Sequence, residues 1–421
     1  MATSRCRAGR ALTIVPTRTE EPVFSPRDTP VRLSADRRHP LLIDIGRLIW
    51  RGWSGRLPTG IDRVCLAYVA HYGARADAVI QWKGRRIVLA GADAERVMTL
   101  LLAGGSVSRR GLMAALARAV PRALTAKPRP RQIYFNIGHT GLNDPGLVAW
   151  ILQHDLRAVH LIHDLIPIET PEYCRPGEAD KHIQRMTNAL VSASGIIGNS
   201  QATLDSLVRF GRTNTLPRPP MVTAWLAGDV LPAKIPAATR DRPYFVTVGT
   251  IEGRKNHLML LQVWQRLIAR MGDDAPRLLL IGQRGWEAEA AFALLDRSTD
   301  LQAAVEEYGR CDDAELASLL RGARALLMPS FAEGFGMPVI EALQLGTPVI
   351  ASDLAVFREI AGTIPTFVPA HDAIGWERTI VDFCGPAPDR TRQLHDMRGY
   401  RAPDWAGHFA TVDAWLETLP A

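Results

Sequence analysis

Short apolar runs alternate with helix-length amphipathic runs through the second half of the sequence. This alternation is typical of a parallel β-sheet covered by helices, so we expect an α/β fold there. The first half is less regular, but its apolar runs are also of strand length, and it too is predicted to be α/β. Strands are predicted at 41–45, 133–137, 159–162, 195–198, 244–249, 277–282, 305–309, 325–329 and 347–351, and helices at 257–271, 286–295, 312–323 and 338–345.

Two domains are expected, because 421 residues with 47% hydrophobic content exceed what one ordinary core holds. Residues 1–38 are rich in arginine and lack the uninterrupted apolar run of a secretory signal, so we predict a disordered tail. The segment 229–243 contains three prolines and shows no periodic pattern of apolar residues, which indicates a linker. The predicted organisation is an N-terminal domain at 39–232, a linker at 233–243 and a C-terminal domain at 244–400, with a helix near 403–418 packing back on the first domain.

The formal net charge of +7 favours anionic partners, such as nucleotide phosphates, a lipid diphosphate or an anionic membrane surface. No zinc finger, basic recognition helix or aromatic RNA-binding pattern accompanies this charge, so no nucleic acid is expected. The five cysteines form no Cys-x-x-Cys pair. No apolar run approaches the ~18 residues that cross a bilayer. A cytoplasmic protein is predicted, with peripheral contact at the inner face of the membrane left open.

A basic amphipathic helix is predicted between 106 and 127. Leu112 and Leu116 share its apolar face, with Val120 one turn further, while Arg118 and Arg122 lie on the opposite side. Such a helix lies on an anionic membrane or packs on its own domain, and both interpretations stay open here. Pro121 is expected to interrupt the helix.

Two glutamates flank a glycine-containing loop in the segment 329–341, which follows a predicted strand and leads into a predicted helix. Gly334 and Gly336 allow the backbone to approach a ligand closely. Free amide groups at a helix start bind anions or hydroxyl groups well. Glu333 and Glu341 are therefore expected to accept hydrogen bonds from hydroxyls on two parts of one ligand; the alternative is that both carboxylates are solvated on the surface.

Adjacent cations occupy a second turn between a strand and a helix, in the segment 248–257. Arg254 and Lys255 lie where amide groups already favour anions, which suits a departing diphosphate. Such a site stabilises the leaving-group charge without a metal ion, and the sequence contains no Asp-x-Asp triplet. No metal is therefore predicted. The alternative is a solvated basic turn.

The two segments, with 312–329, 346–352 and 359–362, closely resemble the C-terminal half of family 4 retaining glycosyltransferases. The resemblance implies the GT-B fold, in which two Rossmann-like domains face each other across a cleft. It implies that Glu333 contacts the donor sugar, Glu341 the nucleotide ribose, and Arg254 with Lys255 the diphosphate. The intervening Gly334, Phe335 and Gly336 belong to the implied donor-binding set.

The first half resembles the same family in three places. The segment 58–63 is similar to the glycine loop that covers the donor phosphates, which makes Gly60 a donor-binding candidate; the alternative is a plain turn glycine. His163 opens a segment similar to one that brings a histidine to the reaction centre; the alternative is a histidine satisfied by a backbone carbonyl. Ser200, in the third segment, is expected to cap a helix rather than to act in catalysis.

These features together predict a retaining, metal-independent hexosyltransferase with Glu333, His163, Arg254 and Lys255 as its catalytic set. It would move a hexose, with mannose implied by the resemblance, from a nucleotide-diphosphate sugar to a saccharide or polyprenyl-diphosphate-linked acceptor in bacterial surface polysaccharide synthesis. No cofactor is expected besides this co-substrate. The alternatives are a non-catalytic nucleotide-sugar-binding or scaffold subunit and another GT-B enzyme such as a nucleotide-sugar epimerase. No Gly-x-Gly-x-x-Gly opens a βαβ unit, which disfavours a dinucleotide oxidoreductase.

Overall fold

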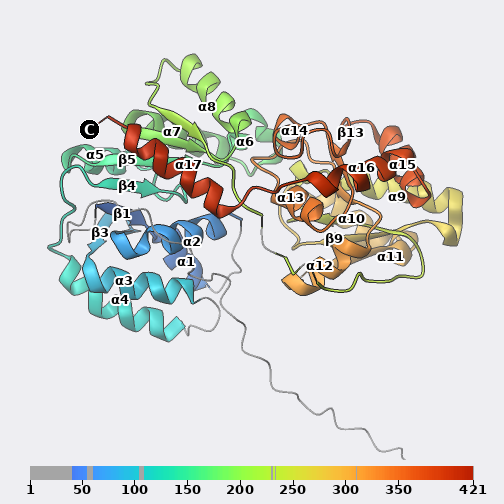
Figure 1. Ribbon diagram of the computed structural model, residues 1–421, viewed down its shortest axis with the longest axis horizontal. Helices are drawn as coiled ribbons and strands as arrows, with labels where there is room; N and C mark the ends of the chain where they lie inside the picture. Colours follow the sequence, from blue (N-terminus) through green and yellow to red (C-terminus); the bar gives the residue numbers. More distant parts are fainter. Residues whose placement is uncertain are drawn as a thin grey trace, which may run out of the picture.

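A computed structural model describes residues 40–54, 60–103, 109–228, 231–232, 234–309 and 311–420. These residues form two α/β domains, each built around its own sheet (Figure 1). The tail predicted at 1–38 and the first residues of the predicted glycine loop, Pro58 and Thr59, lie outside the described residues.

The first sheet has the strand order β3-β2-β1-β4-β5-β6-β7. Its paired strands are parallel except for β3, which pairs antiparallel to β2 at one edge. Strand β1 lies in the interior of the sheet, between β2 and β4, and all four of its residues are buried, as expected where helices cover both faces. The strands are β1 (Leu41–Asp44), β2 (Ala76–Trp82), β3 (Arg85–Leu89), β4 (Ile133–Asn136), β5 (Arg157–Ile162), β6 (Ala193–Gly198) and β7 (Met221–Thr223).

Helices connect these strands and pack on the sheet. They are α1 (Gly46–Ser54), α2 (Gly60–Tyr72), α3 (Gly91–Leu102), α4 (Arg109–Ala123), α5 (Pro145–Gln153), α6 (Ile166–Glu169), α7 (Glu178–Ser192) and α8 (Gln201–Thr213), with the 3₁₀ turns η1 (Gly73–Arg75) and η3 (Pro171–Tyr173). Ser200 caps α8 as predicted, because its side chain accepts a hydrogen bond from the backbone N–H of Thr203.

The second sheet is wholly parallel, with the order β10-β9-β8-β11-β12-β13. Its strands are β8 (Tyr244–Val248), β9 (Arg277–Ile281), β10 (Val305–Tyr308), β11 (Leu326–Met328), β12 (Val349–Ser352) and β13 (Thr366–Val368). Its helices are α9 (His257–Met271), α10 (Glu289–Arg297), α11 (Thr299–Ala304), α12 (Asp313–Gly322), α13 (Met337–Gln344), α14 (Ala355–Ala361), α15 (Ala373–Cys384) and α16 (Pro388–Asp396), with the 3₁₀ turns η4 (Gly253–Lys255), η5 (Gly272–Asp274) and η6 (Met397–Gly399).

One helix of the second half begins later than predicted. The pattern predicted a helix at 286–295, whereas α10 begins at Glu289. The residues before it form a loop because Glu287 adopts a left-handed backbone conformation, with φ of 53°, which a continuous right-handed helix does not permit.

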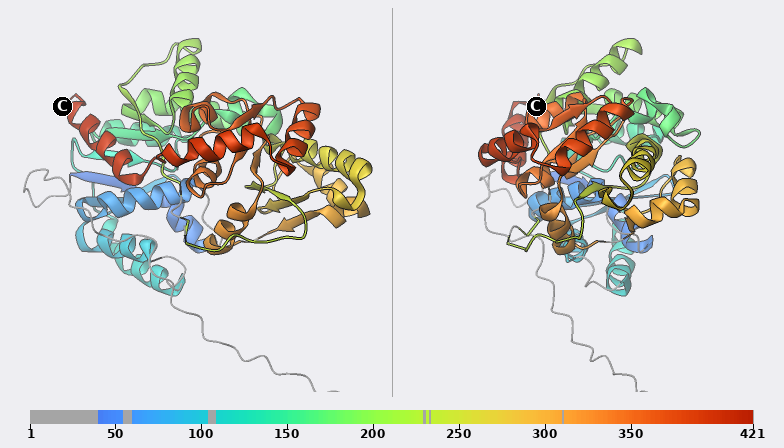
Figure 2. Two further views of the ribbon diagram at one scale, coloured as in Figure 1. Left: turned by 45° about the vertical axis from the view of Figure 1, so that its right-hand side comes forward. Right: turned by 90° about the vertical axis from the view of Figure 1, so that its right-hand side faces the viewer.

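The last helix, α17 (Trp405–Thr418), returns from the second domain to the first, as Figure 2 shows. The Tyr68 hydroxyl lies 2.9 Å from Nε2 of His408, and the Tyr72 hydroxyl donates a 2.7 Å hydrogen bond to Asp413. The ring of Phe409 packs edge-on against Tyr68 at 5.1 Å. This helix therefore ties the end of the chain to α2 of the first domain.

The predicted basic amphipathic helix is α4, and its apolar face is buried in its own domain. Leu112 and Leu116 belong to the core of the first domain and Val120 is half-buried, so this face is not available to a membrane. The prediction that Pro121 interrupts the helix is wrong, because α4 continues to Ala123. Pro121 has no N–H to donate to the carbonyl of Ala117, so this one helical hydrogen bond is missing, and α4 ends two residues later.

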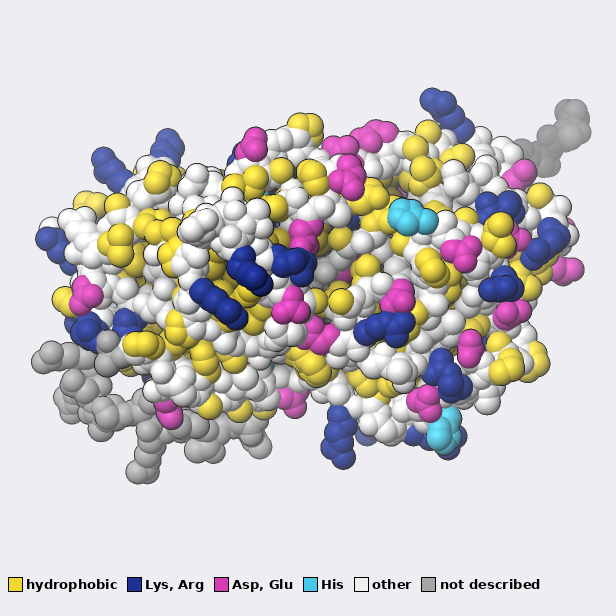
Figure 3. All heavy atoms as spheres, turned by 90° about the horizontal axis from the view of Figure 1, so that it is seen from above, with side chains coloured by type: hydrophobic (Ala, Val, Ile, Leu, Met, Phe, Trp, Pro, Cys, Tyr) yellow, Lys and Arg dark blue, Asp and Glu magenta, His cyan; other side chains and the backbone are white. Residues whose placement is uncertain are grey.

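Across the described part of the chain, no helix combines the length and the apolar character needed to span a membrane. On the face shown in Figure 3, basic and acidic side chains are interspersed over both domains. The net positive charge is therefore not gathered into one patch on that face.

Candidate active site

The two segments singled out in the second half lie side by side. Strands β8 and β11 are parallel neighbours, so the turns that follow them meet at the same edge of the sheet. The backbone N–H of Phe331 donates a 2.8 Å hydrogen bond to the carbonyl of Arg254. The side-chain amide of Asn256 donates to the carbonyls of Pro329 and Ala370, at 3.2 and 2.9 Å. These bonds fix η4 against the loop that carries Glu333.

Glu333 forms ion pairs with both predicted cations. Its carboxylate lies 2.8 Å from Nη1 of Arg254 and 2.5 Å from Nζ of Lys255, and it accepts a 2.7 Å hydrogen bond from the Ser330 hydroxyl. Its side chain is 7% exposed. Burial alone would raise the pKa of Glu333, but Lys255 and Arg254 more than offset it and lower the pKa to about 2. Glu333 is therefore a carboxylate at every physiological pH.

Glu252 completes this cluster, and sequence reasoning missed it. Its carboxylate lies 2.6 Å from Nη2 of Arg254, and its side chain is 4% exposed. Burial raises the pKa of Glu252, while Arg254 and Lys255 oppose the shift. The available signal was an acidic residue two positions before Arg254 in the same turn. With all four groups charged, two carboxylates balance two cations, so the cluster is internally neutral.

Glu341 lies on α13, buried near the connection between the domains. A Cβ atom added at Gly228, which follows the first sheet, would lie 3.3 Å from Cγ of Glu341. Burial raises the pKa of Glu341 to about 7, with Arg63 lowering it and Asp313 raising it further. The surface-solvated alternative for Glu341 is therefore wrong, because the side chain is not at the surface.

His163 follows β5 in the first domain, and its ring is held by the backbone. Its Nε2 lies 2.8 Å from the carbonyl oxygen of Ile137. A carbonyl only accepts, so Nε2 carries the hydrogen in this contact. Burial lowers the pKa of His163 to about 4, so the ring is neutral near pH 7 and its Nδ1 remains an acceptor. This contact is the one expected for a histidine whose ring is bound to a backbone carbonyl. The catalytic role of His163 stays a prediction.

The backbone at Gly334 lies where the two domains touch. A side chain there would clash with the carbonyl oxygen of His163, and the hydroxyls of Ser200 and Thr203 both donate to the carbonyl of Gly334 at 3.3 Å. Gly336 has a φ of 106°, which favours glycine, and caps the start of α13. The backbone at Gly334 therefore approaches the first domain closely.

The remaining members of the predicted donor-binding set lie in the same region. Phe335 is buried in the core. A side chain at Gly60, the first residue of α2, would clash with the side chain of Met337 at the start of α13. The structure therefore brings Gly60 of the first domain against the loop and helix that follow β11, so the predicted residues of the two domains converge.

Two further contacts join the domains around this site. The carboxylate of Glu359 on α14 accepts hydrogen bonds from the backbone N–H groups of Gln201 and Ala202, at 2.7 and 3.0 Å, at the start of α8. A carboxylate is favoured there because the helix start carries free amides and a partial positive charge. The rings of Tyr173 and Phe331 stack at 4.7 Å with an interplanar angle of 2°.

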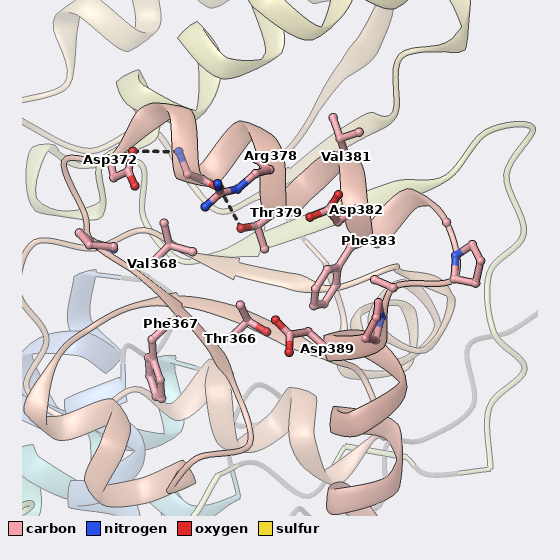
Figure 4. A pocket seen from close by; sticks show the side chains of 16 residues that line it. Thr366, Phe367, Val368, Asp372, Arg378, Thr379, Val381, Asp382, Phe383 and Asp389 are labelled. Carbon is pink, nitrogen blue, oxygen red and sulfur yellow. Dashed lines mark hydrogen bonds between the residues drawn. The ribbon is translucent and has the colours of Figure 1, made fainter.

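Among the described residues, neither a candidate metal site nor the pocket shown in Figure 4 includes the predicted site residues. Over the residues that the structure describes, no group of three or more His, Cys, Asp or Glu side chains is arranged to hold a metal ion. A pocket of about 660 Å³ lies on the second domain between β13, α15 and the start of α16 (Figure 4). It contains none of the predicted site residues, and its lining includes Arg378, Asp382 and Asp389.

The architecture is that of the GT-B glycosyltransferases. The chain superposes on sucrose-phosphate synthase from Thermosynechococcus elongatus with a TM-score of 0.60, at 17% identity, over 90% of this chain and 99% of that one. Anabaena Alr3699/HepE in complex with UDP and glucose also gives a TM-score of 0.60, at 14% identity, with the same coverages. The predicted fold class, α/β with two Rossmann-like GT-B domains, is confirmed.

Residues 233–374 match the family described as glycosyl transferases group 1. The chain is 32% identical over 223 residues to O-antigen chain mannosyltransferase B of Escherichia coli, a match that covers 50% of this chain and 57% of that protein. It is 31% identical over 226 residues to the serotype-specific mannosyltransferase WbdA of E. coli, of which it covers 27%. The matches thus span about half, or less, of the length of these relatives.

Proposed function

We propose that the chain is a retaining, metal-independent hexosyltransferase that moves mannose from a nucleotide-diphosphate donor to a saccharide or lipid-linked saccharide acceptor. The cluster of Arg254, Lys255 and Glu333, beside His163 of the other domain, carries the proposal. The mannosyltransferase names of the relatives support the choice of sugar, and the UDP bound to a structural neighbour supports a nucleotide donor.

The cluster suggests how a donor would enter this site. Arg254 and Lys255 are neutralised by carboxylates, so a diphosphate must replace Glu333 as the partner of at least one cation. The released carboxylate remains ionised because its pKa lies far below neutrality. It can then accept hydrogen bonds from hydroxyls of the sugar. As the anomeric bond breaks, the two cations take up the charge that develops on the departing diphosphate.

The acceptor is assigned to the first domain, which would also exclude water by closing on the donor. Ser200, Thr203 and the backbone at His163 already contact the loop that carries Glu333. Water kept from the donor cannot hydrolyse it. His163 is proposed to face the reacting groups with Nδ1 as a hydrogen-bond acceptor.

The proposal is tested by a screen of nucleotide-sugars, including GDP-mannose and UDP-glucose, first for thermal stabilisation and then for turnover. A ligand at 100 times its Kd stabilises the folded state by about 2.7 kcal/mol, which gives a measurable rise in Tm. We expect one donor to stabilise the protein and to release nucleoside diphosphate when acceptor-containing membranes are added. Stabilisation without any turnover would favour the non-catalytic alternative.

Activity is expected to survive exhaustive EDTA treatment with at most a modest change. The reason is that the side chains of Arg254 and Lys255 supply the positive charge that a divalent ion supplies in other enzymes. The measurement is the rate of nucleoside diphosphate release before and after chelation. Complete loss of activity, restored only by a divalent ion, would contradict the assignment of leaving-group stabilisation to these two cations.

Glu341 makes donor binding depend on pH. With a pKa of about 7, its ionised fraction falls as the pH is lowered from 8 to 6. An ionised carboxylate can accept hydrogen bonds from both ribose hydroxyls. In the protonated carboxyl group one oxygen carries a hydrogen and donates instead, so one of these contacts is lost. We expect donor KM to rise by up to about 10-fold over this range, and the rise to be absent in Glu341→Gln. An equal rise in the variant would assign the pH dependence to another group.

A further inference from the structure

Three of the exposed tryptophans of the first domain each have a cation over the ring. Trp50 and Trp53 of α1 are 53% and 54% exposed, and Trp82 at the end of β2 is 61% exposed. The Arg51 guanidinium lies 5.7 Å from the Trp50 ring, and Lys83 Nζ lies 5.1 Å from the Trp82 ring. Over Trp53 the cation is Arg109 of α4, at 5.9 Å. We call Trp50, Trp53 and Trp82 with Lys83 and Arg109 the tryptophan face.

The elements of the tryptophan face meet at one edge of the first sheet. Helix α1 starts directly after β1, and a Cβ atom at Gly46 would lie 3.2 Å from the backbone nitrogen of Gln81, next to Trp82. At the other end of α1, a Cβ atom at Gly52 would lie 3.1 Å from the side chain of Leu112 on α4. Strands β1 and β2 are parallel, so this is the edge formed by their carboxyl ends. His163 follows β5, parallel in the same sheet, and so lies at that edge too.

The elements that carry these rings, and α4 beside them, are basic in sequence. Helices α1 and α4 contain no acidic residue, and neither does the β2–β3 turn from Trp82 to Arg86. The nearest carboxylate that pairs with α1 is Asp62, which is buried and bound between Arg47 and Arg51. Arg109 and Arg110, at the start of α4, are exposed. The charge of this face therefore complements an anionic surface.

We propose that the tryptophan face docks on an anionic phospholipid bilayer. Tryptophan rings favour the level of the lipid headgroups, where the ring is partly desolvated and its N–H keeps a partner. Arg109, Arg110 and Lys83 would bind headgroup phosphates. The membrane contact that the sequence left open for α4 is thus placed instead at α1 and the β2–β3 turn, because the apolar face of α4 is buried. The inference goes beyond the proposed function, because docking requires neither donor nor acceptor.

The test is co-sedimentation of the full chain with vesicles of phosphatidylcholine, alone or with one-third phosphatidylglycerol. We expect binding to the anionic vesicles that weakens with added salt. Trp50→Ser with Trp53→Ser should lower the partition coefficient at least ~10-fold, because two interfacial aromatic groups are lost. Arg109→Gln and Arg110→Gln should each lower it roughly fivefold. The matched control is Leu152→Ser on α5, whose side chain is 66% exposed, and it should bind as the wild type does.

Three outcomes would overturn the inference. They are equal binding by the double tryptophan variant and the wild type, equal binding to both kinds of vesicle, and absence of binding to either. A dimer that is lost in the double tryptophan variant, without vesicle binding, would instead assign this face to a second copy of the chain. Circular dichroism and the donor-induced rise in Tm should be unchanged in every variant, because the substituted side chains are exposed and lie outside the donor site. These readouts separate the failure of docking from the failure of the proposed function.

Discussion

Arg254→Ala and Lys255→Ala are each expected to lower kcat by at least ~10-fold, because each removes a charge-assisted contact to the departing diphosphate. The two variants should differ in stability. Arg254 lies between Glu252 and Glu333, so its removal leaves one buried carboxylate without its ion-pair partner and the other with Lys255 alone. Breaking such a pair from one side costs about 3 kcal/mol, and Arg254→Ala should therefore have the lower Tm.

The measurement combines steady-state kinetics with thermal unfolding. Arg266→Ala is the matched control, since Arg266 on α9 of the same domain pairs with Glu377 but is exposed and outside the cluster. Its kcat should equal that of the wild type. Arg254→Lys keeps the charge and should recover part of the rate. Full activity in the double Ala variant would remove this pair from the mechanism.

The second domain was largely predictable from its sequence, because local signals mark its elements. Helix α9 covers the predicted 257–271, and Asp312 caps α12 by accepting from the N–H of Glu315. Gly346 has a φ of 74°, which suits the residue that ends α13. The strands that sequence reasoning missed, β2, β3, β7 and β13, include both edges of the first sheet and one edge of the second, where exposure weakens the apolar pattern.

The site was only half predictable. Two turns that follow parallel strands meet at one sheet edge, so the proximity of Arg254 and Glu333 could be expected from the order of the elements. That they form an ion pair, with Glu252 as a third partner, depends on side-chain geometry that no local pattern encodes. The contact of Gly334 with the backbone at His163 depends on how the two domains dock, which the sequence of either segment alone does not determine.

Glu333→Gln is expected to lower kcat and, at the same time, to bind nucleoside diphosphate more tightly. The amide cannot neutralise Arg254 and Lys255, so a diphosphate no longer competes with an internal carboxylate for them. The diphosphate then forms its charge-assisted contacts without displacing a carboxylate, so the Kd of the nucleoside diphosphate should be roughly 10-fold lower. The slower chemistry follows because the sugar loses a contact that strengthens as the anomeric bond breaks, at a cost on the order of 10²-fold in kcat.

Glu341→Gln provides the contrast, and together the two variants test the division of labour within the pair. A ribose contact is the same before and during the reaction, so its loss should raise donor KM while leaving kcat near that of the wild type at saturating donor. Glu333→Gln should stay slow even when donor is abundant. The experiment measures kcat, donor KM and the Kd of the nucleoside diphosphate for both variants. The reverse pattern would exchange the two roles, and a Glu333→Gln variant with weaker diphosphate binding would mean that this carboxylate positions the cations instead of competing for them.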